Sequence, residues 1–184
     1  MGRIVFGAIL GLILAPFALL AWSKWGRPPV AVDDPPLLME PQLTQAPLKA
    51  RIARETPGKP PIQADEDNLV AGAEVYRDQC ASCHGFHGKP VNFAAHMYPT
   101  APALWEKHQN SNAVGVSDDQ PGEIYWKVAN GIRLTGMPAF KDTLTETRMW
   151  QVSLLLANAD KPLPPKARAI VRGIEPTTPA DETQ

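Results

Sequence analysis

Two cysteines and a histidine stand close together in the sequence Cys80-Ala81-Ser82-Cys83-His84. Two thiols three positions apart, followed directly by an imidazole, form the C-x-x-C-H pattern that attaches a c-type haem. In that chemistry the sulfur atoms of Cys80 and Cys83 add to the two vinyl groups of the porphyrin, and His84 binds the iron. The pattern therefore predicts one covalently attached haem c, with His84 as the proximal iron ligand.

The same cysteines allow other chemistry. A C-x-x-C pair is also half of a zinc site, a redox-active dithiol or a disulfide, and His87, His96 and His108 are available to complete a Cys2His2 set. A thioredoxin-like dithiol is expected within a βαβ pattern, which is not visible in this sequence. We favour the haem interpretation because a histidine directly follows the second cysteine and the chain has no third cysteine.

A second candidate iron ligand lies further along the chain, in Gly136-Met137-Pro138. A methionine thioether is a soft ligand, and Pro138 keeps the adjoining backbone extended. Isolated methionines are more often core residues, and Met97 and His96 compete for the same role. The Gly-Met-Pro context leads us to predict Met137 as the distal ligand.

Three segments with helix-start signals and apolar side chains at helical spacing are expected to position these residues. Their predicted ranges are 65–79, 118–130 and 143–158. The expected N-caps are Asp65 or Asp67, Asp118 or Asp119, and Thr143 or Thr145, respectively.

These features in their order along the chain resemble a class I, mitochondrial-type, monohaem cytochrome c domain over residues 66–165. The resemblance is carried by the C-x-x-C-H motif, by Gly72 and Tyr76 on the first helix, by Ala101-Pro102-Ala103-Leu104, and by the loop from Asn130 to Phe140. It implies an all-α fold around one covalent haem, and single-electron transfer as the function.

The resemblance also implies roles for individual residues. The Pro102 carbonyl should accept the Nδ1 proton of His84, and Leu104 should pack on the haem ring. Gly72 and Tyr76 should pack against the last helix, where Trp150 and Leu154 are the expected contacts. Arg133, Trp105 and Trp126 are candidates to hold or shield the haem propionates.

An uncharged run of 19 residues extends from Ile4 to Trp22. It is long enough to cross a bilayer as a helix, and no clean small-x-small cleavage site follows it. We therefore predict an uncleaved membrane anchor. The resemblance implies that the haem domain lies on the outer, periplasmic side of a bacterial cytoplasmic membrane.

The predicted organisation has four parts: a transmembrane anchor (1–22), a proline-rich extended linker (23–65), the cytochrome c domain (66–165) and a proline-rich polar tail (166–184). Closely spaced prolines disfavour helix, so the linker is expected to be extended. It is either a simple tether or an arm that orders on a neighbouring subunit.

Charge excludes one class of partner. The chain has a net charge of −1 and no basic stripe, whereas nucleic-acid binding needs a basic surface. Residues 66–161 carry eight Lys and Arg against eleven Asp and Glu, so the domain is mildly acidic. We predict an electron carrier without a small-molecule substrate, tethered to or part of a respiratory or photosynthetic complex. The alternatives are a haem enzyme or gas sensor with an open iron position, and a haem-free zinc or interaction module.

Overall fold

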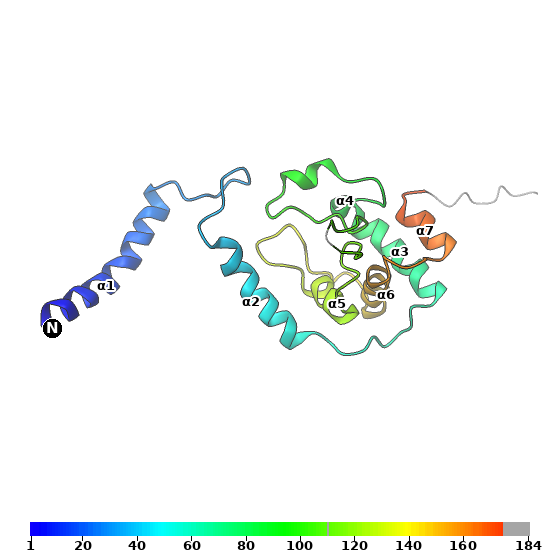
Figure 1. Ribbon diagram of the computed structural model, residues 1–184, viewed down its shortest axis with the longest axis horizontal. Coiled ribbons are helices and arrows are strands. Elements are labelled where there is room, and N and C mark those ends of the chain that lie inside the picture. Colours follow the sequence, from blue (N-terminus) through cyan, green and yellow to red (C-terminus); the bar gives the residue numbers. More distant parts are fainter. Residues whose placement is uncertain (110, 175–184) are drawn as a thin grey trace, which may run out of the picture. The chain divides into compact units, whose positions relative to one another are not determined.

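The computed structural model describes residues 1–109 and 111–174, and within them the chain is helical (Figure 1). The helices are α1 (Gly2–Trp25), α2 (Glu40–Glu55), α3 (Glu66–Gln79), α4 (Ala81–His84), the 3₁₀ helix η1 (Asn92–His96), α5 (Pro121–Asn130), α6 (Glu146–Ala157) and α7 (Pro165–Val171). The described residues form no strand, only the isolated bridges Phe86–Lys89 and Lys107–Val114. This confirms the all-α prediction.

The chain divides into two compact units, residues 1–42 and 43–184. The first unit contains α1, in which no side chain is buried. Its 24 residues are long and apolar enough to cross a membrane, and α1 is the one such helix among the described residues. A signal sequence near the N-terminus has the same properties, so the helix fits membrane anchoring without requiring it.

Helix α2 corrects the expectation of an extended linker, because it forms across the proline-rich stretch and holds Pro47 in its interior. Pro41 lies in the first turn, where the missing N–H costs no hydrogen bond. The remaining residues of α2 are mostly good helix formers, such as Leu, Gln, Ala, Lys, Arg and Glu. The short run without further proline, from 48 to 55, gives α2 a regular second half.

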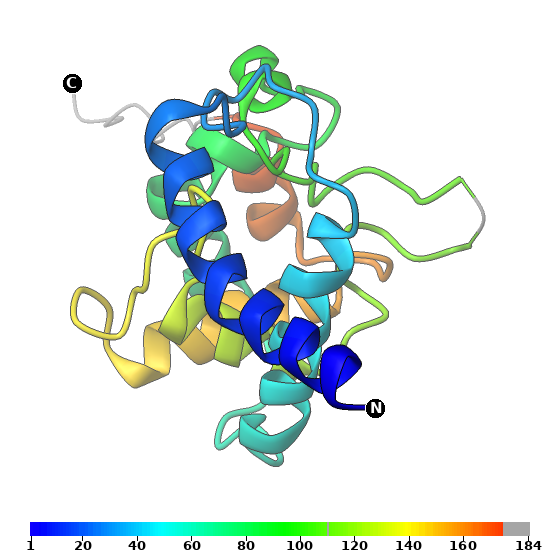
Figure 2. The ribbon, with the colours of Figure 1, turned by 90° about the vertical axis from the view of Figure 1, so that its left-hand side faces the viewer.

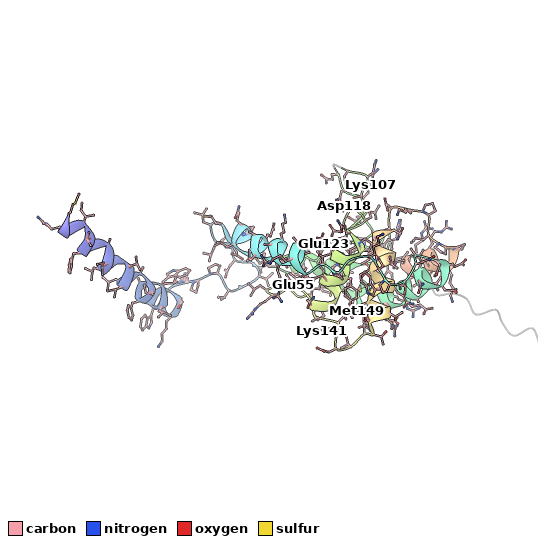
Figure 3. All side chains as sticks on the ribbon, turned by 90° about the horizontal axis from the view of Figure 1, so that it is seen from below. Glu55, Lys107, Asp118, Glu123, Lys141 and Met149 are labelled. Carbon is pink, nitrogen blue, oxygen red and sulfur yellow. The ribbon has the colours of Figure 1, made fainter. Side chains whose placement is uncertain are left out.

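The C-terminal end of α2 packs against α5 within the second unit. Trp126 Nε1 donates a hydrogen bond of 3.0 Å to Glu55, and the Arg51 guanidinium lies 5.8 Å from the centroid of the Trp126 ring. Ile52 is only 5% exposed, and a Cβ at Gly122 would collide with the backbone that follows α2. Figure 3 labels Glu55 at this end of α2. This part of the predicted linker is therefore held on the domain.

Replacing Trp126 with Phe should release this end of α2. Phenylalanine keeps an aromatic ring at this position, although a smaller one, while the hydrogen bond to Glu55 is lost and the stacking with Arg51 is weakened. We expect tryptic cleavage after Arg51 and Arg54 to become several-fold faster in native protein, because proteolysis reports local opening. Equal cleavage rates in the wild type and the variant would show that the contact does not hold α2.

The core of the second unit is built on the crossing of α3 and α6, with α5 and α7 packed beside them (Figure 1). A Cβ at Gly72 of α3 would collide with the backbone of Gln151 and lie 3.2 Å from Leu155 Cβ of α6. The close approach predicted at Gly72 is therefore present, but Leu155 rather than Leu154 makes the contact. The aromatic contacts also differ from the expectation, because Trp150 stacks on Tyr125 of α5, with ring centroids 4.2 Å apart.

Helix α7 was not predicted, because residues 166–184 were expected to be a polar tail. Three of its side chains, Ala167, Ile170 and Val171, are at most 1% exposed and pack into the core beside α3. His87 N–H also donates to the Val171 carbonyl at 2.8 Å. The ordered domain thus extends to at least residue 173, and residues 175–184 of the predicted tail lie outside the described part of the chain.

The helix starts partly match the predictions. Asp65 caps α3, where its carboxylate accepts the Asn68 N–H at 2.9 Å. Thr145, not Thr143, caps α6, because the Thr143 hydroxyl donates instead to the Phe140 carbonyl. Gln120 precedes α5 without a side-chain cap, so neither Asp118 nor Asp119 has the predicted capping role.

Asp119 instead forms an ion pair with Lys127 of α5, at 2.6 Å, and Glu123 approaches the same ammonium at 2.9 Å. Burial opposes the charge of Lys127, but the hydrogen bonds with these carboxylates outweigh it and raise its pKa above the usual 10.5. Because the folded-state pKa is raised, the stabilisation is fully present below pH 10.5 and is lost as the pH rises through the folded-state value.

Substituting Lys127 with Met should lower the free energy of unfolding by about 1 kcal/mol at neutral pH, because two carboxylates lose a shared cation. Urea denaturation of wild type and variant as a function of pH measures the difference. We expect the difference to shrink as the pH rises above 10.5 and to vanish once it passes the raised folded-state pKa, where the wild-type ammonium loses its proton. A difference that stays constant across this range would assign the effect to packing.

Candidate functional site

The C-x-x-C-H motif lies at the junction of α3 and α4. Cys80 follows the last residue of α3 and precedes α4, and its carbonyl accepts the N–H groups of Cys83 and His84 at 3.1 and 3.0 Å. This single helical turn brings both thiols and the imidazole to the same short segment. Both cysteines are half-buried and not joined in a disulfide.

The imidazole of His84 is held by the backbone of a distant loop. Its Nδ1 lies 2.7 Å from the Pro102 carbonyl oxygen, so Nδ1–H donates and Nε2 is the nitrogen left with a lone pair. Burial lowers the pKa of His84, and the bond to Pro102 offsets this only in part. The ring is therefore neutral at physiological pH, as a metal-binding imidazole must be.

The surroundings of the thiols do not suit a redox-active dithiol. Such a site needs a thiol with a lowered pKa, whereas burial and the neighbouring Cys83 raise the pKa of Cys80 to about 12. The zinc alternative also lacks its ligands, because no three His, Cys, Asp or Glu side chains cluster to hold a metal in residues 1–109 and 111–174. The arrangement instead keeps Cys80 protonated and apolar in character, beside the core.

The loop that follows α4 is tied back to α3. The buried Tyr76 hydroxyl donates to the Gly85 carbonyl at 2.6 Å, and the Tyr76 ring meets Trp105 edge to face at 5.4 Å. Gly85 has a φ of 74°, a backbone conformation that favours glycine. Leu104, next to Trp105, is 7% exposed and belongs to the core. These contacts fix the segment that supplies Pro102.

Met137 lies in the loop after α5, and backbone hydrogen bonds close that loop on the end of the helix. Gly131 has a φ of 64°, and a Cβ there would collide with the backbone of residues 137–139. Thr135 Oγ1 donates to the Ile132 carbonyl and accepts the Met137 N–H at 3.0 Å. At the far end, Phe140 N–H donates to the Val128 carbonyl. Met137 is therefore held on a loop that is constrained at both ends.

The two candidate ligand segments share one core. Met137 and Cys80 are both half-buried and pack against the buried cluster that contains Leu104 and Trp105. The two loops also touch directly, because a Cβ at Gly136 would lie 2.5 Å from the terminal methyl of Met97. Met97 thus packs on the backbone next to Met137.

The other predicted site residues are placed differently. Arg133 is exposed on the Met137 loop, and His96 is exposed at the end of η1. Trp126, a candidate for shielding a propionate, is instead bonded to Glu55 of α2. The hydrogen bond from the Tyr76 hydroxyl to the Gly85 carbonyl is not among the sequence predictions, although a tyrosine on the apolar face of a helix needs a partner for its hydroxyl when it is buried.

The residues present fit a covalently attached haem. Two unbridged thiols and a neutral imidazole with a free Nε2 stand at the required spacing. Trp105 Nε1 and Trp150 Nε1 are buried and have no hydrogen-bond partner within the described part of the chain, and a buried donor needs an acceptor. Trp105 follows Leu104 in the segment that supplies Pro102, where a haem propionate would be an acceptor of the kind that its indole lacks.

Comparison with known proteins agrees with this geometry. The family model described as cytochrome C oxidase, cbb3-type, subunit III matches residues 67–154, which include α3, the C-x-x-C-H motif and the Met137 loop. No curated protein and no solved structure gives a match.

Proposed function

We propose that the chain is a membrane-anchored carrier of single electrons, because residues 67–154 match the model of a cytochrome c family and the residues present fit one covalently attached haem c. The observation that best supports the proposal is the orientation of His84 by the Pro102 carbonyl, at 2.7 Å. That bond would leave Nε2 free to bind a haem iron, and Met137 would be the second iron ligand. Cys80 and Cys83 would hold the haem through thioether bonds.

When bound, the haem supplies an iron that alternates between Fe(II) and Fe(III). The chain's contribution is to hold the ligands still. Pro102 fixes the ring of His84 and increases its basicity, and the Thr135 hydroxyl holds the backbone at Met137. Methionine as an axial ligand favours the reduced state relative to a second histidine. If His84 and Met137 both hold the iron, electron transfer would require little rearrangement.

We further propose that the host is a respiratory oxidase complex in a bacterial cytoplasmic membrane. The support is the description of the matching family and the apolar helix α1. In this arrangement α1 anchors the chain, and the haem domain lies on the periplasmic side. The enzymatic activity would then belong to the complex, and this chain would deliver electrons within it.

Gentle detergent extraction of native membranes, followed by native electrophoresis with haem staining, tests whether this chain is part of such a complex. We expect the haem stain of this chain to migrate with a larger complex that consumes oxygen. Migration of the full chain as a free monomer under several mild detergents would contradict membership of such a complex, but would leave the proposed electron transfer intact. The haem spectrum of the same band, recorded before and after reduction, tests the proposed electron transfer separately.

A further inference from the structure

The chain turns where the apolar helix α1 ends. Gly26 N–H donates to the Trp22 carbonyl at 2.7 Å, and a Cβ at Gly26 would collide with that carbonyl and with the Trp22 ring. Trp22 and Trp25 are both exposed, and the Lys24 ammonium lies 5.4 Å from the centroid of the Trp25 ring. Tryptophan and basic residues are typical of the boundary between a bilayer and water. This end of α1 is therefore suited to a membrane surface.

Two acidic side chains build turns in the segment between α1 and α2. The Asp34 carboxylate accepts the N–H groups of Val30 and Ala31, at 2.9 Å each, and closes the first turn. The Glu40 carboxylate accepts the Leu37 N–H at 2.8 Å and closes the second turn. Specific hydrogen bonds therefore shape this segment, unlike a simple tether.

Residues 34–39, which we call the return segment, lie beside the end of α1. Leu37 and Leu38 line an open hollow of about 370 Å³ together with Trp22 and Arg27, all within the first unit. The last three side chains of the return segment are apolar and exposed, by 48% for Leu37, 92% for Leu38 and 57% for Met39. The return segment thus brings an apolar surface next to the aromatic and basic end of α1.

Folding does not account for these exposed side chains. Leu38 gains almost no burial from its position, and Met39 has a φ of 67°, a left-handed conformation that costs a methionine about 1 kcal/mol. Exposed apolar side chains gathered in one place are typical of a binding surface. This surface continues that of α1, in which no side chain is buried, because Trp22 belongs to both. Under the proposed anchoring, lipid covers α1 as far as Trp22, so lipid is also the cover nearest to Leu38.

We propose that the return segment is a second membrane contact. Its three apolar side chains enter the interfacial layer of the lipid, and Arg27, which lines the same hollow, binds phospholipid phosphate. This inference rests on the proposed membrane anchoring by α1. As a helix, the stretch from Glu40 to Ile52 spans roughly 20 Å, and Ile52 is buried in the second unit. The contact therefore holds the haem domain near the membrane instead of leaving the whole linker free to extend.

A fluorescent label tests the contact in the haem-loaded, full-length protein, reconstituted in vesicles of phosphatidylethanolamine and phosphatidylglycerol. Bimane is attached to the thiol introduced by Leu38→Cys. Phospholipids brominated on their acyl chains quench a label in lipid, and iodide quenches a label in water. We expect the brominated lipids to lower the emission at least about twofold, and iodide to quench several-fold less than in Ile174→Cys. Ile174 is the matched control because it is an exposed apolar residue of the second unit.

The other outcomes are distinct. Strong quenching by iodide with none by the brominated lipids would overturn the proposal, and so would weak quenching by both, which would place the label against protein. Leu12→Cys, in the middle of α1, tests the anchor with the same label. Absence of lipid quenching there would contradict the anchoring itself. Label found on Cys80 or Cys83 would show that the haem is not attached, and would contradict the proposed electron transfer.

A charge variant tests the role of Arg27. In the protein labelled at position 38, Arg27→Gln should reduce quenching by the brominated lipids to about half, because one bond to phosphate is lost. Lys49→Gln, at an exposed lysine on α2, should leave the quenching unchanged. Equal losses in both variants would assign the effect to overall charge, and no loss in Arg27→Gln would contradict its binding to phosphate.

Discussion

Met137→Ala should remove the sulfur ligand while leaving the domain folded. The oxidised variant is expected to lose the weak far-red band that arises from sulfur-to-iron charge transfer. Its reduction potential should fall by more than about 120 mV, roughly a hundredfold in the redox equilibrium constant for one electron. The physical reason is that thioether ligation favours the reduced state. Absorption spectra combined with a redox titration measure both effects.

Met97→Ala is the control for this prediction. Met97 is half-buried and packs on Gly136, so it lies close to the Met137 loop, but we do not expect it to bind the iron. Its substitution should retain the far-red band. Loss of the band in Met97→Ala and its retention in Met137→Ala would reassign the distal ligand.

Gly72→Ala should destabilise the domain by about 2–4 kcal/mol, although alanine favours helix by about 1 kcal/mol over glycine. The added Cβ would collide with the carbonyl group of Gln151, and backbone in the middle of α6 cannot move aside cheaply. The crossing of α3 and α6 therefore decides the sign of the effect. Guanidinium unfolding of the haem-loaded protein gives the change in free energy.

The neighbouring residue supplies a matched control. Ala71→Gly on the same helix should cost about 1 kcal/mol through helix propensity alone. If Gly72→Ala instead stabilises the protein by a similar amount, the two helices are not in contact at Gly72. That outcome would contradict the packing at the centre of the fold.

Local sequence signals predicted the parts of the domain that depend on local geometry. The capping carboxylate of Asp65 and the glycine at the helix crossing follow from interactions that a short sequence determines. The start of α6 was harder to predict, because Thr143 and Thr145 are both threonines and are equally suitable as N-caps. Which of them caps depends on where the chain leaves Phe140, whose carbonyl accepts the Thr143 hydroxyl.

Tertiary contacts determine the parts that were missed. Pro165 looked like the start of a tail, yet it occupies the first position of α7, where proline suits a helix. Ile170 and Val171 are adjacent and lie between Arg168 and Arg172, in a segment too short to show a convincing period, and only their burial beside α3 reveals their role. Pro47 similarly led to an extended prediction for a segment that forms α2.

In the candidate site, too, local sequence predicted some features and tertiary contacts determine the others. The motif itself identified Cys80, Cys83 and His84, because attachment chemistry requires their spacing. The bond from His84 to Pro102 joins residues 18 positions apart and entered only through resemblance to a family. The role of Trp126 depended on which side chain lay opposite it, and that proved to be Glu55, 71 positions away. Sequence spacing alone does not specify such partners.

Figure 2 shows that long loops, drawn in green and yellow, connect the helices of the second unit. The segments that supply Pro102 and Met137 belong to these loops and are held by hydrogen bonds at several points. If His84 and Met137 both bind the iron, these constraints would leave no iron position for an external molecule.

Carbon monoxide binding to the native, full-length protein after reduction tests this central claim most directly. With His84 and Met137 occupying both axial positions, the absorption spectrum of the reduced protein should remain unchanged when carbon monoxide is added. A rapid shift of the haem bands on mixing would reveal an open iron position. That result would contradict the account of the protein as a single-electron carrier and would favour a haem enzyme or gas sensor.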